Sequence, residues 1–492
     1  MNKPASMFCG RASRRNFLSD LGLGLGGIAL GSLLSTDRVS QASVDEAAMV
    51  QSTIHPHAKN VIWIFLSGGV SHLETFDPKP LLNTFAGKTF DETNLPNPQK
   101  LPVYRERSRS VVGMDREVIS TIMPLQIGFK QHGQNGIWVS DWLPNLAKVA
   151  DDLCIVRSMY TTDNDHNAEF QFQNGRHSLD EQQPCIGSWI SYGLGSLNEN
   201  LPQFVFLGQY KDTRVKRNFD ANYLGPQHAG IELSLDPSNP LPFGRRMPDV
   251  LPGEQQSQYD LIHQWNSLAA QANPHDHQLA ARVRSYELAF RMQMSAPEAL
   301  DLSQETQETR SLYGIDNATT ELYGKRLLTA RRLAERGVRY TLVYLSDYGE
   351  WDSHSNIREL HAKCCGRVDK PLAGLIADLK RRGMLDETLV VCATEFGRTP
   401  ALEKTTLNKA GTGRDHHPHG FTIWMAGGGL KSGYVHGTTD ELGFHAVEHP
   451  HYVTDIHATA LHLLGLDSRQ LGIPGRKRLE VDYGQVIDDI IA

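Results

Sequence analysis

Four stretches of this sequence place carboxylate and imidazole side chains next to apolar runs. Residues 67–80, 346–354 and 394–400 each follow such a run, and residues 413–419 precede one. The candidate metal ligands in these stretches are Asp352, His354, Glu395 and His416. A mixed Asp, Glu and His set suits Zn²⁺, Mn²⁺ or Fe²⁺ better than Ca²⁺, which prefers oxygen ligands alone. The sequence therefore predicts a divalent-metal site and leaves the number of ions open.

Each of these residues also has an interpretation without a metal. Asp352 and His354 could lie in a solvated turn, and Glu395 could simply pair with Arg398 at the end of a strand. His416 is a stronger candidate, because a carboxylate such as that of the preceding Asp415 often orients a ligand histidine. The grouping of all these residues near strand ends is harder to attribute to chance than any one of them.

Six short apolar runs indicate the strands that would position these residues. The runs are continuous rather than alternating, which is typical of a parallel sheet covered on both faces. Helical patterns at 279–294 and 323–334 lie between them, with Gly337 expected just after the second helix. We therefore predict a three-layer α/β/α domain with a mostly parallel central sheet, and ligands outside the carboxyl ends of its strands. The predicted strands are 61–66, 153–156, 204–207, 339–345, 388–393 and 421–425.

The N-terminal residues resemble a twin-arginine export signal. Arg14 and Arg15 precede Phe-Leu and an uncharged stretch at 21–36, which is shorter than the roughly 20 apolar residues that span a bilayer. We predict a signal peptide at 1–42, a linker at 43–60 and one domain at 61–492, with insertions near 78–136 and 211–258. The signal implies passage through the twin-arginine translocase to a periplasmic or secreted location, and an uncleaved anchor is the alternative.

Composition and absent motifs exclude several classes of protein. The net charge is −7 and no Lys/Arg run is present, so we expect no nucleic-acid partner. The chain has six cysteines and no Cys-x-x-Cys motif; Cys9 would leave with the signal, and we expect no dependence on disulfides. No Gly-x-Ser-x-Gly elbow is present, and Leu82 stands where a P-loop needs its first glycine.

In chain order, these motifs resemble the Domain of Unknown Function 1501 family, exported sulfatase-like proteins of the alkaline phosphatase superfamily. The resemblance runs from about Val61 to the C-terminus. Its most specific pieces are Gly-Gly-Val-Ser-His at 68–72, Asp-Pro-Lys-Pro at 77–80, Gly-Glu-Trp-Asp-Ser-His at 349–354, Thr-Glu-Phe-Gly-Arg-Thr at 394–399, Gly-Arg-Asp-His at 413–416 and Gly-Thr-Thr-Asp-Glu at 437–441. A late segment, 453–465, also resembles sulfatases, and we interpret its Asp455 as a structural residue consistent with a helix N-cap.

The resemblance implies a metal-dependent hydrolase of phosphate or sulfate esters, with a polysaccharide or other envelope material as a candidate substrate. By motif position, Asp352 and His354 resemble ligands of one metal, and His416 stands near a late histidine ligand of the superfamily. Glu395 stands where the superfamily has an Asp ligand. Arg398 suits a tetrahedral oxyanion and would stabilise charge on the transferred group.

The sequence departs from the superfamily pattern at three places. Ser-Gly-Gly at 67–69 follows the first strand where an Asp ligand is normal, so His72 or Asp77 would have to replace it. Phe396 stands where a second His ligand is expected. No Cys or Ser lies between positions 162 and 175, which argues against a formylglycine sulfatase.

The missing nucleophile leaves several mechanisms and a second function open. His166 is a candidate ligand, general base or covalent nucleophile, while Thr161, Thr162 or a metal-bound water could attack instead. The rival hypothesis is a catalytically degenerate envelope protein that binds sulfated glycans or acts as a scaffold. Convergence of Asp352, His354, Glu395 and His416 would favour the hydrolase, and their separation would favour the binding protein.

Overall fold

The computed structural model describes residues 54–109, 120–208, 217–236, 238–239, 241, 251–273, 277–403 and 411–492. The predicted export signal at 1–42 and residues 43–53 of the predicted linker lie outside these ranges. Within them, none of the helices combines the length and apolar character that a bilayer crossing requires.

The described chain is built around a nine-stranded, mostly parallel sheet. The strand order is β12-β4-β11-β8-β1-β7-β5-β6, with β15 also paired to β4. Only β11 runs antiparallel within this described sheet, between β8 and β4. Its strands are β1 (Asn60–Phe65), β4 (Cys154–Tyr160), β5 (Phe204–Leu207), β6 (Ile231–Glu232), β7 (Tyr340–Tyr344), β8 (Thr388–Ala393), β11 (Phe421–Ala426), β12 (Tyr434–His436) and β15 (His451–Tyr452). All six predicted strands are therefore confirmed.

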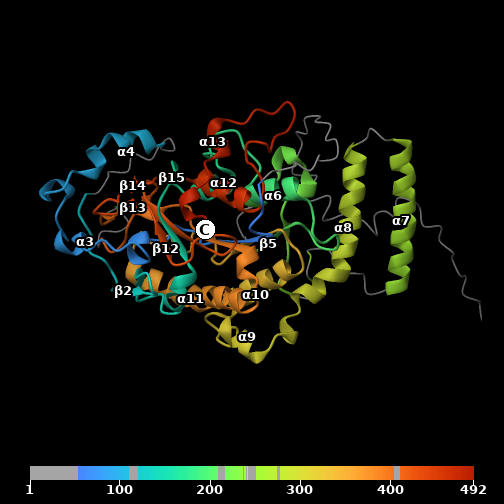
Figure 1. Ribbon diagram of the computed structural model, residues 1–492, viewed down its shortest axis with the longest axis horizontal. Coiled ribbons are helices and arrows are strands. Elements are labelled where there is room, and N and C mark those ends of the chain that lie inside the picture. The colour runs from blue at the N-terminus through green and yellow to red at the C-terminus, as the bar shows by residue number, and fades with distance from the viewer. Residues whose placement is uncertain are drawn as a thin grey trace, which may run out of the picture.

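Helices cover both faces of the sheet, as Figure 1 shows. On one face lie α10 (Glu321–Glu335) and α11 (Ile357–Arg381), and on the other lie α6 (Ile186–Leu194) and α12 (Val453–Leu463). Alternation along β1 divides its side chains between two cores: Ile62 and Ile64 join the first, whereas Trp63 and Phe65 join the second. The predicted three-layer α/β/α domain is thus confirmed.

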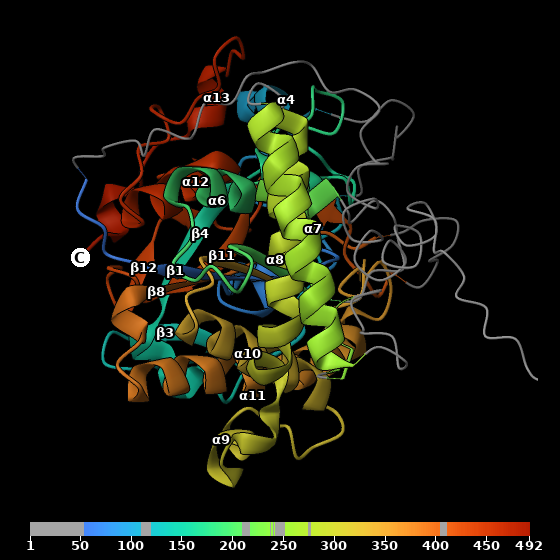
Figure 2. The same ribbon diagram turned by 90° about the vertical axis from the view of Figure 1, so that its right-hand side faces the viewer.

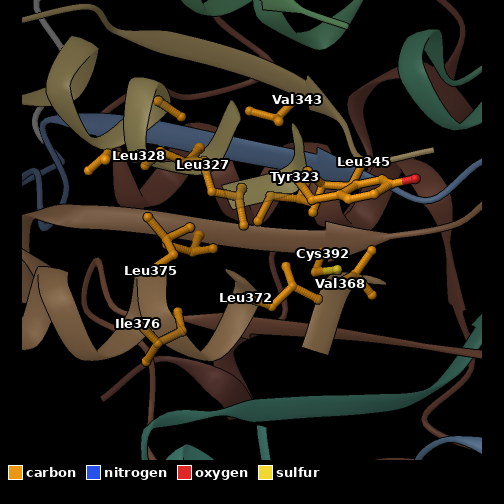
Figure 3. Close-up of a cluster of buried hydrophobic side chains, with 14 of the residues drawn as sticks. Tyr323, Leu327, Leu328, Val343, Leu345, Val368, Leu372, Leu375, Ile376 and Cys392 are labelled. Carbon is orange, nitrogen blue, oxygen red and sulfur yellow. The ribbon is translucent and has the colours of Figure 1, made fainter. Parts of the chain in front are cut away.

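The core on the α10 and α11 side is filled by aliphatic side chains from both helices and the strands beneath them. Figure 3 shows Leu327 and Leu328 of α10 and Leu375 of α11 in this cluster, with Val343 of β7 among them. All four are 0% exposed. This apolar packing is what holds β7, and therefore the loop that follows it, in a fixed position.

Two long helices, α7 (Pro252–Ala272) and α8 (His277–Leu300), pack against each other beside the domain (Figure 2). The predicted helical stretches at 279–294 and 323–334 lie within α8 and α10, and Gly337 has the expected positive φ, +83°. The start of α7 lies inside the predicted insertion at 211–258. The other α-helices and strands of the described residues are α3 (Leu81–Thr84), α4 (Pro102–Arg107), α5 (Ala168–Asn174), α9 (Gln307–Leu312), α13 (Glu480–Tyr483), β2 (Phe129–His132), β3 (Ile137–Ser140), β9 (Gly397–Arg398), β10 (His416–His417), β13 (Thr438–Thr439) and β14 (Ala446–Glu448).

Two smaller expectations have different outcomes. The cysteines of the described residues are free and buried, in agreement with a protein that does not depend on disulfides. The N-cap reading of Asp455 is wrong, because β15 leads directly into α12 and makes Tyr452 the N-cap. Asp455 instead lies in the first turn, where its carboxylate accepts a hydrogen bond from the Gln485 amide at 2.9 Å.

Candidate metal centre

The four polar stretches meet at one edge of the sheet. Those after β1, β7 and β8 lie at the carboxyl ends of parallel strands, as does the segment after β4 that contains His166. The stretch at 413–419 precedes its strand, but β11 is antiparallel, so its beginning lies at the same edge. The chain direction of β11 therefore explains why a stretch before a strand joins stretches that follow strands.

Asp352 lies at the centre of the converging side chains. Its Oδ1 is 2.9 Å from His354 Nε2 and 3.0 Å from His416 Nε2, and its Oδ2 is 3.2 Å from His166 Nε2. The two rings of His354 and His416 approach each other, with 3.1 Å between their Nε2 atoms. Three imidazoles thus point one nitrogen each toward a single carboxylate.

Two overlapping groups of side chains could hold a metal ion. The first contains His166, Asp352 and His416, and the second contains His354, Asp415 and His416. Within each group, one ligand atom from each residue lies within 4.8 Å of the others. The structure therefore brings together three of the four predicted ligands, Asp352, His354 and His416. His166, for which a ligand role was one of the alternatives, joins them, as does Asp415, which was expected only as an orienting carboxylate.

The second nitrogen of each ring is held by a different oxygen. His166 Nδ1 lies 3.1 Å from Glu395 Oε1, His354 Nδ1 contacts the carboxylate of Glu403, and His416 Nδ1 lies 2.8 Å from the carbonyl oxygen of Asn164. Such partners fix the tautomer and the orientation of a ligand ring. Glu395, which was predicted as a ligand, lies outside both groups and instead contacts His166 at Nδ1, the nitrogen that faces away from Asp352.

A tight glycine turn after β1 supports Glu395 and Asp352. The Gly68 amide donates to Glu395 Oε1 at 2.7 Å, and Gly68 has a φ of +120° that favours glycine. A Cβ at Gly68 would lie 2.5 Å from the Trp351 nitrogen, so only glycine fits against the loop that carries Asp352.

Arg398 is buried with 0% exposure and is committed to internal partners. It donates to the Gly69 carbonyl at 2.8 Å, to the Arg414 carbonyl at 3.1 Å, and to Asp352 Oδ1 at 2.8 Å. This geometry supports a role in holding Asp352 and the glycine turn. The expected role on a transferred group stays a prediction.

His72 lies apart from the converging side chains. Its Nε2 is 2.8 Å from the Gly443 carbonyl oxygen, the ring is 1% exposed, and a Cβ at Gly397 would lie 2.6 Å from its Nδ1. Burial lowers the pKa of His72, which disfavours the imidazolium form of the ring. Asp77, the other expected replacement for a first-strand ligand, pairs with Lys79 at 3.1 Å. Neither residue belongs to the two ligand groups.

The carboxylates govern the protonation of the centre. Burial would raise the pKa of Asp352, but hydrogen bonds from His166, His354 and His416 hold it well below its usual range. Burial would lower the pKa of His166 and of His354, yet contacts with Asp352, and with Glu395 or Glu403, raise these pKa values to about 10 and about 9. Burial lowers the pKa of His416. These contacts therefore favour the imidazolium forms of His166 and His354 at neutral pH, beside the ionised Asp352 carboxylate.

A family model described as "Protein of unknown function (DUF1501)" matches residues 58–491. The chain belongs to this family. No curated protein matches it. Solved structures that resemble the DUF1501 chain include a phosphonate monoester hydrolase from Silicibacter pomeroyi, with 14% identity, 70% of this chain and 71% of that chain covered, and a TM-score of 0.34. Another is the PsFucS1 sulfatase from Pseudoalteromonas sp., with 13% identity, 95% and 76% covered, and a TM-score of 0.34. A third is an alkaline phosphatase from the Antarctic bacterium TAB5, with 10% identity, 83% and 98% covered, and a TM-score of 0.31.

Two carboxylates of the DUF1501 centre were missed by sequence reasoning. Glu169 is 1% exposed and accepts hydrogen bonds from Ser67 Oγ at 2.6 Å and Tyr344 Oη at 2.6 Å. Its position three residues after His166, in the first turn of α5, is a signal that could have found it. Glu403, 4% exposed, is part of no motif, and no sequence signal marks it.

Aromatic rings line the centre beside the imidazoles. Phe396 packs against His166 and His416, with ring centroids 5.6 and 4.4 Å apart, and Tyr348 packs against His166 at 5.7 Å. Phe396, at the position where the sequence resemblance led us to expect a second histidine, forms an apolar wall against these rings. The donor set, imidazole nitrogens with carboxylate oxygens, fits Zn²⁺, Mn²⁺ or Fe²⁺ and does not resemble an all-oxygen Ca²⁺ site.

Proposed function

We propose that this DUF1501 protein is a metal-dependent hydrolase of phosphate or sulfate esters. The observation that carries the proposal is the convergence of three imidazoles on Asp352, in two ligand groups that share His416. A degenerate binding protein has no need for imidazoles whose far nitrogens are each held by a dedicated oxygen. The order of the motifs along the chain, which resembles the alkaline phosphatase superfamily, supports the same reaction.

The ligand groups indicate which residues would hold one or two ions. His166, Asp352 and His416 would hold one, and His354 and Asp415 would complete a second group around the shared His416. When bound, a divalent cation would polarise the ester oxygen and lower the pKa of water. We propose Zn²⁺, Mn²⁺ or Fe²⁺, because imidazole ligands favour these ions over Ca²⁺.

The remaining residues orient the ligands. Glu395 and Glu403 hold His166 and His354 with their Nε2 atoms directed at Asp352, and Arg398 holds the carboxylate from the buried side. Phe396 and Tyr348 keep water from one side of the rings. Preorganised groups of this kind are what a charged transition state requires.

The structure favours water over a threonine as the attacking group. The Thr161 hydroxyl is 0% exposed and donates to Gln171 Oε1 at 2.5 Å, while the Thr162 hydroxyl accepts from Gln171 Nε2 at 2.8 Å. His166 is also poorly placed for a covalent role, because its two ring nitrogens face the carboxylates of Asp352 and Glu395. We therefore propose attack by water and no covalent intermediate on the chain.

Metal content and ester turnover test this function together. The purified full chain would be analysed by mass spectrometry for bound metals, and assayed with p-nitrophenyl phosphate and p-nitrophenyl sulfate. We expect measurable turnover in the parent and its loss in His354→Ala/His416→Ala, which should also bind less metal per chain than the parent by the amount held at the centre. Glu387→Gln, at a surface position with 54% side-chain exposure, is the matched control. A folded parent that takes up no metal at the centre from supplemented medium would refute the proposal.

We also propose that the protein is exported, on the twin-arginine resemblance at Arg14 and Arg15. A polysaccharide or other envelope ester would then be accessible to it as a substrate. Replacing both arginines by lysine should retain the protein in the cytoplasm, as measured by fractionation. Export of the variant at the parent level would contradict this assignment.

A further inference from the structure

A second group of histidines lies at the edge of the sheet, outside the centre described above. His436 ends β12, the edge strand beside β4, and His451 begins β15, which also pairs with β4. His449 lies in the connection between β14 and β15, and Asp489 lies near the C-terminus. Both views of the molecule place the C-terminus beside β12 (Figures 1 and 2).

The ligand atoms of this group are already within coordination range of one another. One atom each from His436, His449 and Asp489 lies within 4.8 Å of the others. His436 Nε2 is 2.9 Å from His451 Nε2, and the two rings stack with centroids 5.1 Å apart. The His449 ring lies 5.1 Å from that of His436. Three donors, from His436, His449 and Asp489, thus converge, and His451 lies directly against His436.

The far nitrogen of His451 is held by a carboxylate. Its Nδ1 lies 3.2 Å from Asp455 Oδ2, and Asp455 is itself fixed by the Gln485 amide at 2.9 Å. A hydrogen bond at Nδ1 leaves Nε2 with its lone pair directed at His436. This carboxylate–histidine arrangement is the one that orients histidine ligands in metal sites.

The backbone around His449 is also shaped for this position. His449 has a φ of +46°, and among the described residues only Asn222 and Asn356 are other non-glycine residues in this region. Its carbonyl oxygen accepts a hydrogen bond from Ser158 Oγ at 2.6 Å, which holds the strained turn against β4. Side chains held in sparsely populated backbone conformations occur preferentially at functional positions.

A simpler interpretation is that these histidines stack at the surface and bind no metal. Two features argue against this interpretation. His436 is only 3% exposed, and its Nε2 lies against the His451 ring. Asp489 adds an anionic oxygen to the three imidazoles, and such a set matches the four-coordinate preference of Zn²⁺.

We propose that His436, His449, His451 and Asp489 form a second, structural Zn²⁺ site. With His451 as the fourth donor beside His436, the set would leave no open position, which is the pattern of structural and not catalytic zinc. The ion would fasten the C-terminal segment to the sheet edge. That segment already lies there through backbone bonds from Lys431 to Ile490 and from Ala492 to Gly429, both at 2.9 Å.

Zinc stoichiometry of the full chain tests the site. The protein would be stripped with a chelator, dialysed against buffered Zn²⁺ and analysed for bound zinc in the parent, in His449→Ala/Asp489→Asn, and in the control His132→Ala. Both His449 and Asp489 are exposed, so the double variant should keep the fold, which the melting temperature of the stripped proteins verifies. We expect the double variant to bind one equivalent less than the parent and the control to bind the same.

Two further outcomes separate this site from the centre around Asp352. His354→Ala/His416→Ala should retain the equivalent of zinc that His449→Ala/Asp489→Asn loses, whether or not the centre has hydrolase activity. Zinc should also raise the melting temperature of the parent by more than that of the double variant, because a bound ion stabilises only the folded state. An unchanged zinc stoichiometry in the folded double variant would overturn the proposal.

Discussion

Replacement of Asp352 by Asn removes one negative charge from the centre and keeps the side chain's size. Asp352 is the residue that His166, His354, His416 and Arg398 all contact, at 2.8 to 3.2 Å. In the parent, its hydrogen bonds are the largest contributions that raise the pKa values of His166 and His354, against the opposing effect of burial. The substitution should therefore change both the strength of metal binding and its dependence on pH.

The raised pKa values of His166 and His354 set the size of the pH effect. A metal bound by His166 or by His354 must displace the proton of that histidine. With pKa values of about 10 and about 9, these protons weaken metal binding at pH 7 by about 10³-fold and about 10²-fold. Each ligand group contains one of these two histidines, so the metal affinity of each group should rise by about tenfold per pH unit between pH 7 and 9.

In Asp352→Asn the protons are held less tightly, so this pH dependence should flatten. Loss of the anionic ligand should also lower the Zn²⁺ affinity at pH 9 by at least about 100-fold. Removal of a residue that only hydrogen-bonds to a ligand already lowers metal affinity by about 10–100-fold. Zn²⁺ affinity would be measured by competition with a chromophoric chelator at four pH values from 6 to 9. Asp347→Asn, an exposed carboxylate five positions earlier, is the matched control. Equal affinity and equal pH dependence in Asp352→Asn and the parent would refute the reasoning.

Three other predictions concern the surroundings of the centre. Glu395→Gln should weaken Zn²⁺ binding by about 10–100-fold in the same competition assay, without loss of the fold, because Glu395 orients His166. Burial, and then the charge of Glu395, raises the pKa of Glu169 to about 8. The protonated Glu169 side chain therefore contributes to the free energy of unfolding fully below about pH 4.5, and this contribution is lost as the pH rises through 8. Glu169→Gln should therefore gain up to about 5 kcal/mol over the stripped parent at pH 9 and little at pH 4, measured by urea unfolding, and an identical pH profile would contradict this. Arg414→Met should cost about 3–5 kcal/mol in the free energy of unfolding, because it leaves the fully buried Glu74 carboxylate, 2.8 Å from the guanidinium, without its cation; a cost under about 1 kcal/mol would contradict it.

The fold could be predicted from the sequence because the strands are buried on both faces. The apolar runs at 204–207 and 388–393 coincide with β5 and β8 at both ends, since burial ends where the chain leaves the sheet. The direction of β11 could not be predicted, because a short apolar run has the same composition in either direction. For that reason the sequence placed residues 413–419 before a strand without explaining their proximity to the other stretches.

The members of the candidate site were easier to predict than their roles. Asp352, His354 and His416 follow from residue type and motif position, and all three converge. Glu395 and Asp415 are both carboxylates beside histidines, and only side-chain geometry separates an orienting carboxylate from a ligand. Glu403 contacts His354 across 49 residues of chain, a pairing that no local pattern records.

The position of β11 between β8 and β4 has a consequence for how the centre forms. His166 follows β4 and Glu395 follows β8, 229 positions apart in the chain, and they face each other only when β11 has been inserted between the two strands. A chain that has made β1 to β8 but lacks β11 therefore holds Glu395 and Asp352 without His166 and His416 in place. The proposed metal binding would then require the completely folded chain, so the first 420 residues would not acquire an ion during synthesis. A truncation before residue 421 should abolish both the centre and the connection between the two parts of the sheet.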